Sequence, residues 1–109
     1  VINKSGLKVY IIHNIDRKLS LEDIAVAKNL TISELLAEIE SIVASGTKLD
    51  LNYYVNEFID PYHTEEIFDY FSEAESDSVQ DALVTLGENE FTEEEIRLVR
   101  IKFMSEVGN

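Results

Sequence analysis

The chain has 109 residues, the size of one domain, and contains no cysteine, one proline and four glycines. Without cysteine, disulfide bridges, thiolate zinc sites and thiol catalysis are excluded. The net charge of −13 is uneven, since residues 51–109 hold fifteen of the 22 acidic residues and three of the nine basic ones. Such a surface repels DNA phosphates and anionic lipid, and its simplest interpretation is a set of solvated helix faces.

The scarcity of turn-forming residues indicates few, long elements, and therefore helices rather than a many-stranded sheet. No apolar run is long enough to cross a bilayer, and the chain does not start with a basic-then-apolar signal segment. We therefore expect a cytoplasmic protein without a membrane partner. Because the chain begins at Val1 rather than Met, we also expect it to be a piece of a longer or processed protein.

A first helix is predicted over about residues 5–15, where apolar residues recur at helical spacing. Its stripe consists of Leu7, Tyr10, Ile11 and Ile15. Val9 and Ile12 widen this stripe, so we expect the helix to be buried on more than one side. Arg17 and Lys18 follow its end, where cations meet the negative pole of the helix dipole.

A helix-turn-helix follows. Ser20 is placed to cap a short second helix, with Asp23 three residues later. Asn29 suits a left-handed turn, and Thr31 with Glu34 forms a capping box that opens a third, longer helix ending near residue 46. Two helices joined by so tight a turn are typical of the motif. The apolar positions of the third helix are Ile32, Leu35, Leu36, Ile39, Ile42 and Val43.

Residues 48–51 alternate polar and apolar side chains and are a candidate short strand, the stub of a wing. Residues 53–59 form an apolar cluster that ends before Pro61. This proline suits the first turn of a fourth helix over about residues 62–74. The face of that helix predicted to be buried consists of Ile67, Tyr70, Phe71 and Ala74.

Asp77 or Ser78 is placed to cap a fifth helix that ends at Gly87, and Thr92 with Glu95 is placed to open a sixth. The inward residues predicted for this last helix are Ile96, Val99, Phe103 and Val107. The sequence therefore predicts an all-α, winged-helix-like fold with about six helices and at most a tiny β-hairpin. We expect one compact domain, with a helix-turn-helix over residues 1–51 and an acidic helical subdomain over residues 52–109 packed on it.

No motif for catalysis or cofactor binding occurs, because Gly-rich phosphate loops, nucleophile elbows and zincin spacings are all missing from the sequence. His63 lies beside Glu65 and Glu66, but one histidine and two carboxylates on one helix turn lack the spread of ligands that a metal needs. We therefore expect no catalytic residue, cofactor or metal in this chain.

Residues 53–71 are rich in aromatic side chains, which suggests either a stacking platform for single-stranded nucleic acid or core packing. A stacking platform needs interleaved basic residues, and this stretch has none, so core packing is the better interpretation. The aromatic residues are Tyr53, Tyr54, Phe58, Tyr62, Phe68, Tyr70 and Phe71.

Several segments together carry a family resemblance. They are Lys18–Ala25, Asn29–Thr31, Ile39–Gly46 and Leu49–Leu51, read alongside Glu94–Val99. The first four resemble the helix-turn-helix domain at the extreme C-terminus of RecQ-type DNA helicases, and the last resembles its closing helix. The resemblance runs from about Lys18 to Phe103 and is least distinctive between Asn52 and Asn89.

The resemblance implies that the parent protein is an ATP-dependent DNA helicase of recombination and repair. ATP binding and hydrolysis, and the motor, zinc-binding and winged-helix domains, would lie upstream in the same chain and would be partners of this module. The module itself would not be an enzyme.

Whether the module contacts DNA depends on charge. The third helix carries no Lys or Arg and three glutamates, so we do not expect it to read bases in a major groove. Basic residues gather instead around the first helix and the start of the motif, where they are candidates for weak, nonspecific phosphate contacts. These N-terminal cations are Lys4, Lys8, Arg17, Lys18 and Lys28.

Two alternatives remain open. The acidic half, residues 57–95, could dock a basic protein partner or another part of the helicase, because it holds no Lys or Arg. A winged-helix transcription regulator is the other alternative, which the third helix disfavours because it has no cation.

Overall fold

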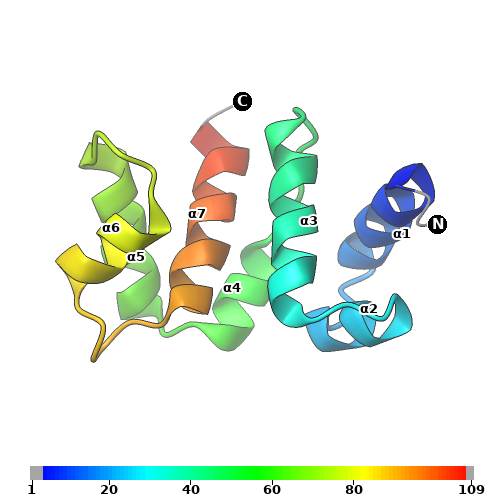
Figure 1. Cartoon of the computed structure of the whole chain (residues 1–109), viewed down its shortest axis with the longest axis horizontal. Helices are drawn as coiled ribbons and strands as arrows, with labels where there is room; N and C mark the ends of the chain where they lie inside the picture. The colour runs from blue at the N-terminus through cyan, green and yellow to red at the C-terminus, as the bar shows by residue number, and fades with distance from the viewer. Residues whose placement is uncertain (1–3, 108–109) are drawn as a thin grey trace.

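The computed structural model describes residues 4–107, with side chains from Gly6 onward, and this part of the chain is all-helical. It forms seven α-helices and no strand within those residues. The all-α prediction is confirmed. The bounds of the seven helices are α1 Lys4–Asp16, α2 Leu21–Ala27, α3 Ile32–Ala44, α4 Asn52–Phe58, α5 Pro61–Glu73, α6 Val79–Leu86 and α7 Glu93–Val107. Figure 1 shows α7 between α3 on one side and α5 and α6 on the other, with α1 and α2 beyond α3.

The helix starts follow the predicted caps. The Ser20 hydroxyl accepts a hydrogen bond from the backbone N–H of Asp23 at 3.0 Å. Thr31 forms both bonds of its capping box with Glu34, and Ser78, one of the two candidates, caps α6. Each cap satisfies a backbone N–H that has no partner inside the helix, which explains why these helices begin where they do.

The predicted number of helices, about six, was too low because α4 was not recognised. Its first residue follows Leu51, which occupies the capping position without a side-chain hydrogen bond. The helix is held instead by burial, since Tyr54 and Val55 are fully enclosed. A short helix that depends on tertiary packing rather than on a cap leaves little signal in the local sequence.

The candidate strand at residues 48–51 is also wrong. This segment has no strand partner, and its backbone is satisfied by a side chain: the Ser105 hydroxyl of α7 accepts from the N–H of Leu49 at 3.3 Å and donates to its C=O at 3.2 Å. Leu49 and Leu51 both point into the core. The alternation of polar and apolar residues therefore reflects one buried side of an extended loop.

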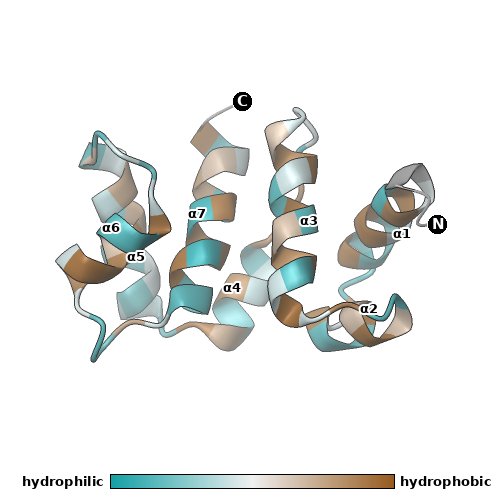
Figure 2. Cartoon of the chain, in the orientation of Figure 1, coloured by the Kyte–Doolittle hydropathy of each residue, from teal (hydrophilic) through white to brown (hydrophobic). Residues whose placement is uncertain are grey.

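A single hydrophobic cluster runs through all seven helices. Its centre is α7, which packs against α3, α4, α5 and α6. Figure 2 shows apolar and polar residues alternating along α1, α3 and α7, as expected for helices that bury part of their surface. None of the helices within residues 4–107 is long and apolar enough to cross a membrane.

Several predicted burial assignments need correction. Val9 is 66 % exposed, so α1 is not buried on more than one side, and Val107 at the end of α7 is 59 % exposed. The inward residues of α7 include Leu98 and Ile101, which the single predicted stripe had missed. Core packing holds for Tyr54 and Phe71 among the aromatic residues. It is wrong for three of them, the exposed Tyr53, Phe58 and Tyr62.

Candidate nucleic-acid interface

The helix-turn-helix is formed by α2, a four-residue connection and α3. Asn29 adopts a left-handed conformation with φ 57°, as predicted, and the N–H of Leu30 donates to the C=O of Ala25 at 2.8 Å. Helix α1 packs against both α2 and α3. Leu30 is half-buried against the core, so the turn is closed by an apolar side chain.

The outward surface of α3 is small and acidic. Ser33, Ala37, Ser41 and Ala44 are exposed along it, and Glu34 is exposed while it completes the capping box. This surface carries no cation of its own that could hold a phosphate or donate to guanine.

Two arginines of α7 reach α3, a contact that the sequence does not predict. The Arg97 guanidinium donates to the Ser33 hydroxyl at 2.8 Å and to the Ser33 C=O at 3.0 Å. Arg100 pairs with Glu40 at 2.7 Å and with the Asp77 carboxylate at 2.9 Å. These contacts join α3, α7 and the loop before α6, so both guanidinium groups are engaged inside the molecule. In the sequence, the only sign was that they are among the three basic residues of the second half.

The comparison with known families rests on this half of the molecule. Residues 5–55 match the model of the RecQ-1-like helix-turn-helix domain. This segment is therefore similar to the helix-turn-helix domain of that family, and we call residues 5–55 the RecQ-1-like domain. The match spans α1, α2 and α3 and ends inside α4, so the predicted resemblance is confirmed there, while the likeness of residues 94–99 to a closing helix stays a prediction. The chain has no match among curated proteins.

The N-terminal cations contact different elements of the RecQ-1-like domain. The Lys8 ammonium donates to the Ser45 hydroxyl at the end of α3, at 3.4 Å. Lys18 lies over the ring of Tyr53 in α4 and Lys28 over that of Tyr10 in α1, at 5.7 and 4.3 Å from the ring centroids. Arg17 is exposed, and the side chain of Lys4 lies outside the described part of the molecule.

These contacts leave the cations accessible. Lys18 and Lys28 are exposed and Lys8 is half-exposed, and none of the three forms an ion pair with a described residue. A hydroxyl or an aromatic face orients each ammonium without neutralising it. Each of the three charges is therefore available for contact with a phosphate.

His63, the weak metal candidate, does not turn toward its sequence neighbours Glu65 and Glu66. Its Nδ1 lies 3.1 Å from a Glu95 carboxylate oxygen and its Nε2 lies 3.6 Å from one of Glu90, so the two ring nitrogens face different carboxylates. The hydrogen bond to Glu95 raises the pKa of His63 above 6.5, helped by the negative charges of nearby carboxylates. Across residues 4–107, no group of three His, Asp or Glu side chains could hold a metal ion.

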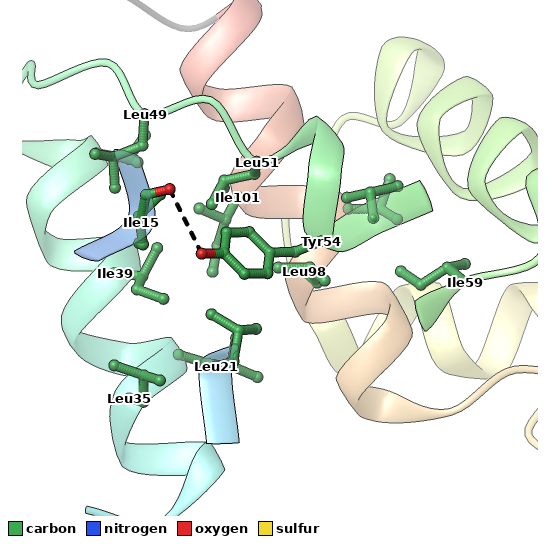
Figure 3. Packing of buried hydrophobic residues seen from close by; sticks show 14 of the residues in the cluster. Ile15, Leu21, Leu35, Ile39, Leu49, Leu51, Tyr54, Ile59, Leu98 and Ile101 are labelled. Carbon is green, nitrogen blue, oxygen red and sulfur yellow. Dashed lines mark hydrogen bonds between the residues drawn. The ribbon is translucent and has the colours of Figure 1, made fainter. Parts of the chain in front are cut away.

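Tyr54 of α4 ties the end of the RecQ-1-like domain to the end of α1 and the connection that follows it. Its hydroxyl donates to the C=O of Leu19 at 2.6 Å and lies 3.5 Å from the C=O of Ile15, the contact drawn in Figure 3. Burial is the main cause that raises the pKa of Tyr54 to about 12, so the phenol stays protonated and keeps donating at physiological pH. A side chain of α4 therefore holds the connection between α1 and α2 in place.

Proposed function

We propose that this chain is a non-catalytic accessory module of a cytoplasmic RecQ-type DNA helicase, acting in DNA recombination and repair. It contacts nucleic acid weakly and without reading sequence, while ATP binding and hydrolysis belong to other domains of the parent protein. The RecQ-1-like helix-turn-helix match over residues 5–55 supports the assignment to this class of protein.

The observation that carries the mode of contact is the distribution of free cations around the motif. The third helix offers carboxylates and small side chains, which a major groove does not attract. Lys8, Lys18 and Lys28 carry charges that no described carboxylate neutralises; Lys8 lies in α1, Lys18 between α1 and α2, and Lys28 at the end of α2. Phosphate contacts by these side chains carry no sequence information. The missing wing within residues 4–107 also removes the main support for a winged-helix transcription regulator.

The experiment is a titration of fluorescein-labelled DNA with the protein, followed by anisotropy at several salt concentrations. We expect weak binding that is equal for scrambled sequences and falls steeply with salt. Substituting Lys18→Ala or Lys28→Ala should each lower the salt slope by about one, because each lysine neutralises one phosphate.

Lys48→Ala is the matched control, because Lys48 is exposed but lies among the carboxylates Asp16, Asp50 and Glu106. It should leave binding almost unchanged. A protein that does not bind DNA at low salt, or that loses as much affinity with Lys48→Ala as with Lys28→Ala, contradicts the proposal.

A further inference from the structure

A second surface, on α4 and α5, combines exposed aromatic rings with unpaired carboxylates. Phe58 and Tyr62 are 59 % and 61 % exposed, and only the short turn between the two helices separates them in the chain. Beginning at Tyr62, exposed side chains recur along α5 at spacings that place them on one side of the helix. We call this set the acidic–aromatic face; it consists of Phe58, Tyr62, Glu65, Glu66, Asp69 and Glu73.

The acidic–aromatic face is not covered by the rest of the described chain. The opposite side of α5 is packed, with Ile67 and Phe71 buried against the core. None of the four carboxylates forms an ion pair with a residue in the described range 4–107. A surface that carries two large exposed rings close together in the chain is unusual if it meets only water.

A hollow of about 260 Å³ continues the face toward α7. Glu65, Phe68 and Asp69 are among the residues that line it. Lys102 is the only cation in its lining, and its charge is already matched, since it pairs with Glu106 at 3.0 Å and lies over the Phe68 ring. The hollow therefore extends the negative surface instead of interrupting it.

We propose that the acidic–aromatic face docks a Lys/Arg-rich segment of a partner protein. Phe58 and Tyr62 would serve as anchors against which guanidinium groups and aliphatic stems pack, and the α5 carboxylates would supply the opposing charge. Charge complementarity selects this occupant. Nucleic acid and anionic membranes are repelled by the same carboxylates, and a second copy of the chain brings a further net charge of −13.

The test uses a short fluorescein-labelled peptide rich in Arg and Lys with interspersed leucines, titrated with the full chain. Charge reversal by Glu65→Lys with Asp69→Lys should weaken binding by more than about tenfold at low salt. The matched control is Asp16→Lys with Glu88→Lys, which changes the net charge equally at exposed carboxylates on α1 and in the α6–α7 turn. Its effect should be much smaller.

Phe58→Ala with Tyr62→Ala tests the anchors separately. This pair should weaken binding by about tenfold, and its effect should persist at high salt, where the charge reversal matters less. Circular dichroism of each variant confirms that the helices remain.

Two outcomes overturn the proposal: a control pair that weakens binding as much as the α5 pair, or aromatic substitutions without effect. Capture of DNA rather than peptide by the acidic–aromatic face would overturn it as well. This inference does not rest on the proposed DNA contact, because Lys18→Ala and Lys28→Ala should leave peptide binding unchanged.

Discussion

His63 links the start of α5 to the start of α7 through Glu95, whose carboxylate has two separate partners. One Glu95 oxygen accepts from the N–H of Thr92 at 2.9 Å and completes a capping box, while the other lies 3.1 Å from His63 Nδ1. The imidazole also stacks on Phe91, with ring centroids 4.3 Å apart. A cap that begins one helix therefore also holds another helix in place.

This arrangement makes part of the stability depend on pH. Because the folded-state pKa of His63 lies above 6.5, its charged form stabilises the fold fully below 6.5, and this contribution is lost as pH rises through the folded-state pKa. We expect His63→Gln to lower the free energy of unfolding more at mildly acidic than at mildly alkaline pH. Urea denaturation at both values checks this, and a variant with equal loss at both would contradict it.

At the residue scale, the helix caps were predictable because the capping hydroxyl and the backbone N–H that donates to it lie within one helical turn. Ser20, Thr31 and Thr92 each bond to a backbone N–H three residues later, so spacing alone identified them. The partners of His63 were missed because Glu90 and Glu95 are about thirty residues away in the sequence. Only the approach of α5 to α7 brings them together.

At the scale of whole elements, the loop before α4 is held by a single hydroxyl. Ser105 is buried, and it satisfies both the N–H and the C=O of Leu49 from the last turns of α7. The side chain thus supplies the bonding that a neighbouring strand would otherwise provide.

Ser105→Ala should therefore destabilise the protein by about 1–3 kcal/mol, because two buried backbone groups lose their partner. Chemical denaturation measures the loss. Ser72→Ala is the matched control, since the Ser72 hydroxyl is exposed and only donates to the Phe68 C=O one turn back in its own helix. A loss no larger than that of the control would show that water replaces the Ser105 hydroxyl.

Six of the seven helices could be predicted because each has a periodic apolar stripe, and five of the six also a recognisable start. The helix that was not predicted is α4, because it depends on the burial of Tyr54, which no local pattern encodes. For α7, the pattern revealed one buried stripe, whereas packing against four other helices buries Leu98 and Ile101 as well. The number of helices that pack against α7 is decided by the tertiary fold, and the local sequence does not reveal it.

For the whole molecule, charge is the dominant property. The chain has nine basic and 22 acidic residues, and the excess of negative charge falls almost entirely on residues 51–109. The sequence located both the N-terminal cations and the acidic half. It could not tell that Arg97 and Arg100 are engaged by α3, or that the rings of Phe58 and Tyr62 are exposed.

Self-repulsion of this size should lower stability in dilute buffer. We expect the thermal midpoint to rise as sodium chloride is added up to about 0.15 M, where screening acts over roughly 8 Å. The variant carrying Glu65→Lys and Asp69→Lys has less excess charge, so its midpoint should respond less. Scanning calorimetry measures both, and a midpoint that falls with salt would point instead to stabilising ion pairs.

The meeting of α3 with α7 has a practical consequence for anyone who handles this protein in pieces. The family match stops at residue 55, yet α3 packs against α7, and Leu98 and Ile101 of α7 are buried in the same cluster as Ile39 and lie near Tyr54 in Figure 3. A fragment that ends at residue 55 would expose to water the apolar side of α3 that packs against α7. Such a fragment should aggregate and be poorly ordered, so we expect the smallest stably folded fragment to extend through α7.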